Sequence, residues 1–213
     1  MEVVSPYLPC RRDSGPDNSN SGKQIKKWSA LAVSDQPGYA TPVIATIEGK
    51  KQYLVFTGTS IIGVDAAGGA LLWRHPWETS YDVNAADPIA IGNSVFITSG
   101  YGKGCALLNI AGGKPAVAWQ NKEIKAHFNS SVLLGEHLYG NSDPDDLVCL
   151  DPKTGAAAWR QKGFEKGGLI AVDGVIIAVG GNTGEVVMVK PDPKSYQELG
   201  RINGKGGLKA LEA

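Results

Sequence analysis

The polar residues best suited to chemistry are His127 and Asn129, which share a loop and which the expected fold brings near Lys103 and Asp143. An imidazole close to a carboxylate and an ammonium group is the kind of cluster from which acid–base catalysis is built. Nothing in the spacing sets the pKa or the geometry that catalysis requires, and an ordinary solvated surface loop explains the same residues. We therefore predict no catalytic residue.

The other motifs do not indicate phosphate, metal or disulfide chemistry. Tyr101–Cys105 is rich in glycine, but it joins two expected strands and opens no helix, so it is not expected to cradle a phosphate. Asp143–Asp146 lacks the Asp-x-Asp-x-Asp-Gly spacing of a calcium loop. The three cysteines include no Cys-x-x-Cys pair, which argues against both a zinc site and a disulfide framework. Cys105 and Cys149 are expected to be small core residues and Cys10 to be exposed, and no metal site is predicted.

A repeated phrase sets the expected fold. Tryptophan recurs at intervals of 40 to 46 residues, at Trp28, Trp73, Trp119 and Trp159. The phrase Asp-x-x-x-Gly-x-x-x-Trp starts at Asp65 and at Asp151, whose carboxylates are expected to accept backbone N–H groups in turns. Four short β-branched runs alternate with Gly, Asn and Asp turns in each period, which predicts four antiparallel strands. Four-stranded repeats of this length are the blades of a β-propeller, so the predicted class is all-β.

The chain divides into a tail and an array of repeats. Residues 1–22 are polar and are expected to be disordered, because they have almost nothing to bury. Propeller repeats are expected over 23–213, with four complete blades at about 41–75, 86–120, 130–161 and 167–202. The fourth blade lacks its tryptophan, because Leu199 stands 40 residues beyond Trp159. Partial blades at 23–28 and 206–211 leave two alternatives: an open arc, or a small ring that the two ends close.

The repeated phrase resembles the tryptophan-docking motif of the pyrroloquinoline-quinone-like (PQQ-like) β-propeller repeats. The resemblance covers roughly residues 23–205. In that family the tryptophans pack between neighbouring blades, which is the structural role expected for Trp73, Trp119 and Trp159. Its members usually form eight-bladed rings, so this chain corresponds to about half of one. They are mostly exported to the bacterial periplasm, which suggests that location here, although the N-terminus shows no signal-peptide pattern.

Propeller topology predicts where a ligand would bind. The loops that join blades and the turns between second and third strands lie on the same rim, and propeller ligands usually bind at such loop-rich surfaces. The candidate ligand-binding residues on this rim are Tyr39, Tyr81, Asn84, Tyr101, Lys103, His127, Asn129 and Asp143.

Two functions follow from the resemblance. The first is a non-catalytic binding or scaffold module whose rim takes a protein, peptide or carbohydrate and which needs no cofactor. The alternative is a fragment of a quinoprotein alcohol dehydrogenase, which would use PQQ with a calcium ion. Such enzymes typically carry an adjacent Cys-Cys pair, and this sequence has none. We therefore favour the binding module.

Charge and hydropathy limit the partners further. Lys+Arg and Asp+Glu both number 21, so no overall basic field would recruit nucleic acid or a membrane surface. No apolar run reaches the length of a membrane span. An open arc would leave blade edges and faces uncovered, which predicts self-association.

Overall fold

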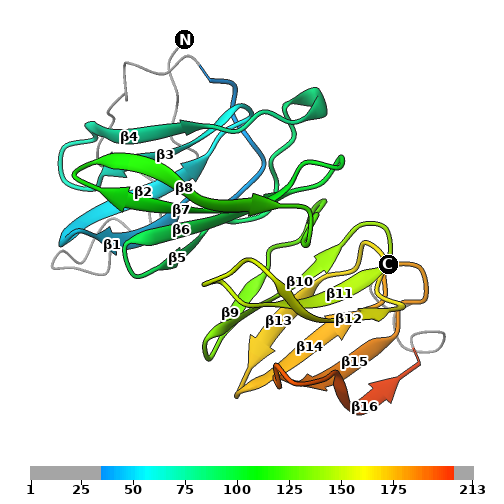
Figure 1. The fold of residues 1–213 in the computed structure, drawn as a ribbon. Helices are drawn as coiled ribbons and strands as arrows, with labels where there is room; N and C mark the ends of the chain where they lie inside the picture. Colours follow the sequence, from blue (N-terminus) through cyan, green and yellow to red (C-terminus); the bar gives the residue numbers. More distant parts are fainter. Residues whose placement is uncertain (1–34, 204–213) are drawn as a thin grey trace, which may run out of the picture.

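The computed structural model describes residues 35–203, which form four sheets that follow one another along the chain (Figure 1). We name these sheets blades A to D. Blade A contains β1 (Val43–Ile47), β2 (Lys50–Phe56), β3 (Ser60–Asp65) and β4 (Leu71–Pro76). Blade B contains β5 (Ile89–Ile91), β6 (Ser94–Ser99), β7 (Gly104–Ala111) and β8 (Lys114–Asn121). Blade C contains β9 (Val132–Leu134), β10 (His137–Ser142), β11 (Asp146–Leu150) and β12 (Ala157–Lys162). Blade D contains β13 (Leu169–Val172), β14 (Val175–Val179), β15 (Val186–Lys190) and β16 (Gln197–Ile202).

Every blade is a four-stranded antiparallel meander in chain order, so the predicted all-β propeller class is confirmed. The first hairpin of each blade turns through a glycine with positive φ, at Gly49, Gly92, Gly135 and Gly174. Tight two-residue hairpins need such angles to match the right-handed strand twist, and glycine adopts them without a steric penalty. The Gly-punctuated sequence therefore produces short hairpins of repeated geometry.

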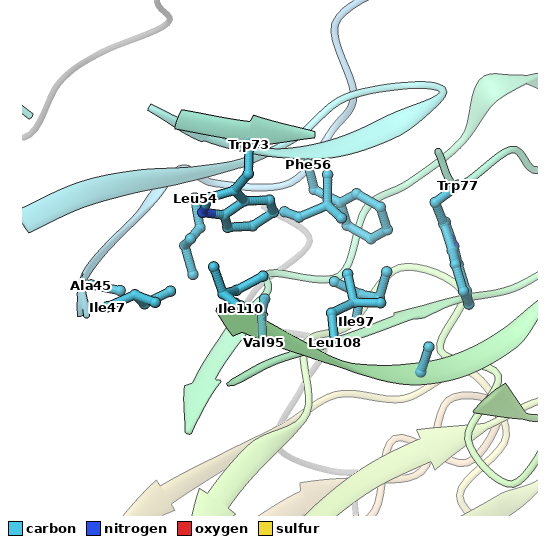
Figure 2. Close-up of a cluster of buried hydrophobic side chains, with 12 residues drawn as sticks. Ala45, Ile47, Leu54, Phe56, Trp73, Trp77, Val95, Ile97, Leu108 and Ile110 are labelled. Carbon is cyan, nitrogen blue, oxygen red and sulfur yellow. The ribbon is translucent and has the colours of Figure 1, made fainter. Parts of the chain in front are cut away.

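Consecutive blades pack face to face through three apolar clusters, one for each blade pair. Figure 2 shows the cluster between blades A and B, where Trp73, Phe56 and Leu54 of one sheet face Val95 and Ile97 of the next. Strand alternation supplies this arrangement, because side chains at i and i+2 point to the same side of a sheet. Each inner blade therefore has an apolar face on both sides.

The repeated tryptophans occupy one register position. Trp73, Trp119 and Trp159 each stand beside a register shift between the third and fourth strands of their blade. In blade D this position belongs to Gly200, which pairs with Met188. The expectation that Leu199 replaces the tryptophan was therefore wrong by one residue, because β15 and β16 form two residue pairs beyond the register shift, whereas β11 and β12 form one.

The described strands form an open arc, with blades A and D at its opposite ends (Figure 1). The register places Ile170, Ile177 and Met188 side by side on the face of blade D that points away from blade C. Ile170 is 58% exposed and Met188 is 39% exposed. The predicted tail 1–22 and the predicted partial blades at 23–28 and 206–211 lie outside the described residues.

Candidate ligand-binding rim

Tyr39 precedes β1, and four connections supply the other candidate residues. They are the A–B loop (77–88), the β6–β7 turn (100–103), the B–C loop (122–131) and the β10–β11 turn (143–145). Contacts between their side chains show that these connections meet on one rim, although they are separated by up to about 60 residues in the sequence.

His127 and Asp143 form the polar centre of this rim. The imidazole Nδ1 lies 2.9 Å from Asp143 Oδ2, and the His127 ring contacts the rings of Tyr101 and Phe128 at centroid distances of 4.3 and 4.2 Å. Both polar side chains are largely buried, with 10% and 21% exposure. The carboxylate therefore orients the imidazole, and two aromatic rings pack against it.

Lys103 takes a different partner from the one that the sequence suggested. Its Nζ lies 4.6 Å from the centroid of the Trp77 ring, in a cation–π contact, rather than beside His127. Trp77 is itself buried at 1% exposure, and its indole Nε1 donates to Ser99 Oγ at 3.0 Å. Lys103 is therefore held against the blade and does not complete an acid–base cluster.

Asn84 departs from the expectation of a ligand-binding rim residue, because it is completely buried. Its Nδ2 donates to the carbonyls of Thr57, Gly58 and Trp77, at 2.9, 2.9 and 3.2 Å. Its Oδ1 accepts from Ser99 Oγ at 2.6 Å. With its hydrogen-bonding groups engaged inside the protein, Asn84 is a structural residue that ties the A–B loop to both neighbouring blades.

Asn129 joins the B–C loop to the next connection. Its Nδ2 donates to the carbonyls of Lys166 and Gly167, at 2.8 and 2.9 Å. A hollow of about 10 Å³ lies at this junction, which is room for about one water molecule. The hollow is lined by Lys125, Ala126, His127, Phe128, Asn129, Asn141, Asp143, Glu165 and Lys166.

Two residues of this surface were not among the sequence candidates. Phe128 is 57% exposed and stacks on His127. Asn141 lines the hollow, and its buried Oδ1 has no hydrogen-bond partner in the structure. Phe128 could have been found from the sequence, because it is an aromatic residue directly after a loop histidine. Asn141 could not, because its position in a strand does not show that it lines a hollow. Among the sequence candidates, Tyr39 and Tyr81 are the most exposed, at 73% and 84%.

The Asp-x-x-x-Gly-x-x-x-Trp phrase forms turns on the opposite rim. Asp151 accepts the Lys153 N–H at 2.8 Å through Oδ1 and the Thr154 hydroxyl at 3.0 Å through Oδ2. Asp65 likewise accepts the N–H of Gly68. These carboxylates stabilise their turns by accepting hydrogen bonds from residues of the same turn.

The three tryptophans differ in their indole partners. The indole N–H of Trp119 donates to Pro152 O in blade C at 2.8 Å, and that of Trp159 donates to Asp192 O in blade D at 2.7 Å. Trp73 instead donates to Gln52 of its own blade at 2.7 Å. In blade B, the turn between β7 and β8 differs from the turn between β11 and β12 of blade C. The blade B version of the phrase is two residues longer.

The described thiols are inert core groups. Cys105 and Cys149 are free and completely buried. Burial raises the pKa of each thiol to about 11, so neither is a thiolate near neutral pH. Between residues 35 and 203, no group of three or more His, Cys, Asp or Glu side chains is arranged to hold a metal ion.

Comparison with known proteins places this arc in a family. The family model described as outer membrane protein assembly factor BamB matches residues 18–161. The crystal structure of BamB from Moraxella catarrhalis matches with a TM-score of 0.56 and 18% sequence identity, over 71% of this chain and 49% of that chain. The chain therefore spans about half the length of that structure. At this identity the likeness shows the fold alone.

No curated protein sequence matches this chain. Within the described residues, no helix is long and apolar enough to cross a membrane. The family model nevertheless covers more than half of the sequence, and the four antiparallel blades agree with the propeller of the matching structure. The chain therefore belongs to the family of PQQ-like β-propeller repeat proteins that is described as the outer membrane protein assembly factor BamB.

Proposed function

We propose that this chain is a non-catalytic binding scaffold that takes a protein partner through its loop-rich rim. The observation that carries the proposal is the exposure of large aromatic side chains there: Tyr39, Tyr81, Tyr101 and Phe128 are 73%, 84%, 40% and 57% exposed. Aromatic residues are enriched in protein interfaces and among their hot spots. Rim loops on a rigid β scaffold are also the usual place for binding residues.

The family supports a protein partner over a carbohydrate. Its model is described as an assembly factor for outer membrane proteins, a role that requires contact with other proteins. We extend that partner class to this chain, and with it a periplasmic location. Because the chain covers 49% of the matched BamB structure, its partner need not be the same protein.

The alternative is a piece of a quinoprotein alcohol dehydrogenase. The adjacent Cys-Cys pair typical of those enzymes is missing from the sequence. The His127–Asp143 pair lies beside a hollow of about 10 Å³, which is far smaller than the several hundred Å³ of a site for a cofactor-sized ligand. Mixing the purified chain with PQQ and calcium, and then removing unbound PQQ by gel filtration, tests this alternative, since a quinone that stays with the protein absorbs visible light.

The proposal includes self-association through the open face of blade D. Three blade pairs in this chain already pack by matching apolar faces, and the outer face of blade D repeats that construction without a described partner. A second copy of the chain, which carries the same aliphatic face, is the occupant that we propose.

Photo-crosslinking tests the binding function. A benzoylphenylalanine at position 81 should capture protein from an extract of the source organism. The same group at Lys153, a 73% exposed side chain on the opposite rim, serves as the control and should capture none. Equal capture from both rims, or no capture from position 81, would contradict a partner site on this rim.

A further inference from the structure

Two aliphatic residues of blade A are buried on the side of the sheet that points away from blade B. Ile62 and Val64 of β3 are 4% and 1% exposed. They alternate with Ile61, which belongs to the cluster between blades A and B, so their side chains project from the opposite face. The described apolar residues that pack against them, Val55 and Leu71, lie on the same sheet. A sheet buries a face against another layer, and these exposures belong to a single chain, so that layer is part of the chain itself.

The register shows what covers the equivalent positions in the other blades. The residues that pair with the tryptophan position of their own blade are Gly63, Leu107, Cys149 and Met188. In blades B, C and D, the two residues that flank this position share a cluster with the tryptophan of the preceding blade. These are Ala106 and Leu108 with Trp73, Val148 and Leu150 with Trp119, and Val187 and Val189 with Trp159. Because Ile62 and Val64 flank Gly63, the same rule puts a tryptophan on them.

The described part of the chain begins at this face of blade A. Arg74 pairs with Ile62 across the sheet and therefore projects from the same side. Its guanidinium Nη2 lies 2.8 Å from Asp35 Oδ1, and the Asp35 side chain is only 6% exposed. The hydroxyl groups of Thr57 and Ser60 also donate to the Asp35 carboxylate. Asp35 thus ties the start of the described chain to the outer side of blade A, whereas its other end follows β16 in blade D, at the opposite end of the arc (Figure 1).

The residues that precede Asp35 contain a tryptophan at the repeat interval. Trp28 stands 45 residues before Trp73, and Trp73 stands 46 residues before Trp119. The family model matches from residue 18 onward, so the repeat includes Trp28. Seven residues of extended chain, the separation of Trp28 from Asp35, reach about 25 Å, which exceeds the length of any strand in blade A. Trp28 is therefore within reach of every position on this face.

We infer that residues 23–34 of this chain cover the outer face of blade A, with the Trp28 indole packed on Ile62 and Val64. The segment takes the place that a preceding blade fills in the three blade pairs of the arc. The occupant of this face is thus a part of the chain, and a second molecule is not needed to bury it.

A covered blade A limits how copies of the chain associate. If blade D of one copy packed on blade A of the next, the contact would be head to tail, and every added copy would offer the same free face again. With blade A covered, the open face of the described arc is the one on blade D, where Ile170 is 58% exposed. Contact between two such faces is symmetric and ends at a pair. This consequence rests on the proposed function, because it assumes the self-association of blade D.

Nuclear Overhauser contacts in the full wild-type chain test the cover directly. With the isoleucine and valine methyl groups labelled, we expect contacts from one indole ring to the methyl groups of Ile62 and Val64. Trp28→Phe removes one indole N–H signal and so identifies which ring this is. Contacts from the Trp28 ring to neither residue would overturn the inference, and this readout does not require any variant to keep its fold.

Sedimentation velocity tests the limit on assembly. The largest wild-type species should be a dimer, and Trp28→Ala should form larger species, because it uncovers Ile62 and Val64. Tyr7→Ala removes an aromatic residue that precedes the covering segment and should sediment like the wild type. Wild-type species larger than a dimer, or no larger species from Trp28→Ala, would overturn the limit. A wild-type chain that stays monomeric would refute the self-association of blade D, while the methyl contacts of Trp28 would still stand, so the two failures are distinguishable.

Discussion

At the residue scale, Gly155 shows why the repeated phrase carries a glycine. It adopts a φ of 76°, and a Cβ built on it would lie 2.6 Å from Cδ2 of Trp119 in the preceding blade. Its carbonyl also accepts a 2.7 Å hydrogen bond from Asn121 Nδ2. The glycine is thus required twice, once by its turn and once by the neighbouring blade.

A pair of alanine substitutions separates these two requirements. Gly135 has a similar φ of 62° but no atom within 4 Å of a built Cβ. Gly135→Ala should therefore lower the free energy of unfolding by about 1 kcal/mol, from the backbone alone. Gly155→Ala should lower it by about 2–4 kcal/mol, because Trp119 must also move. Urea denaturation measures both, and equal losses would show that the Trp119 contact contributes nothing.

His75 on β4 makes the stability depend on pH. Burial and the nearby positive charge of Lys103 lower its pKa below the ordinary value of 6.5. The folded state therefore holds this imidazole neutral, and stability is complete above pH 6.5. As the pH falls below that value, the unfolded chain takes up the proton more readily, and stability is lost. His75→Gln should reduce the fall in unfolding free energy between pH 7 and pH 5, and an unchanged pH slope would argue against this role.

At the element scale, the A–B loop depends on Asn84. One buried side chain satisfies three carbonyls and one hydroxyl that belong to blade A, blade B and the loop itself. In addition, the Asn84 carbonyl accepts the N–H of Tyr39 at 2.9 Å. The position of Tyr81 beside Tyr101 therefore depends on an interior residue of the same loop.

Removing the Asn84 amide should be costly. Asn84→Ala leaves buried carbonyls without donors, so we expect a loss of about 3 kcal/mol in the free energy of unfolding. Thr79→Val in the same loop removes only one part-buried hydrogen bond, to Val83 O, and should cost about 0.5–1 kcal/mol. Thermal or chemical denaturation compares the two, and similar losses would mean that the loop is not held by Asn84.

At the scale of the whole molecule, the arc has an apolar face with no described cover. Ile170, Val172 and Ile202 of blade D are 58%, 42% and 71% exposed. Exposed patches of neighbouring aliphatic side chains usually mark an interaction surface. The same alternation that packs blade C against blade D thus presents a second face to solvent.

Charge on this face should prevent self-association. We expect the wild-type chain to associate with increasing concentration, and Ile170→Glu with Met188→Glu to stay monomeric in sedimentation velocity experiments. Both sites are exposed, so the fold should lose little stability. Val117→Glu changes a 45% exposed valine of blade B and should associate like the wild type. A monomeric wild-type chain at all concentrations would rule out this interface.

The sequence by itself determined the repeated structure of this protein. The intervals between the tryptophans, the Asp-x-x-x-Gly-x-x-x-Trp phrase and the β-branched runs are all local signals, because each blade is built from neighbouring residues. They predicted four-stranded antiparallel blades and the family, and both were confirmed. Even here a local rule failed at Gly200, because the number of residue pairs beyond the register shift differs between blades without leaving a sequence signal.

Only the tertiary structure decided which rim residues are available to a partner. Asn84, Tyr81 and Lys103 all read as polar or aromatic loop residues, yet one is buried, one is exposed and one lies over a tryptophan ring. The ring contacts of Tyr101 with Tyr81 and with His127 likewise join side chains from three separate connections. Exposure and contact depend on how blades stack, and stacking is set by apolar faces whose partners lie some 40 residues away in the chain. A sequence pattern specifies each face, but only the packed arc shows what those faces bring together.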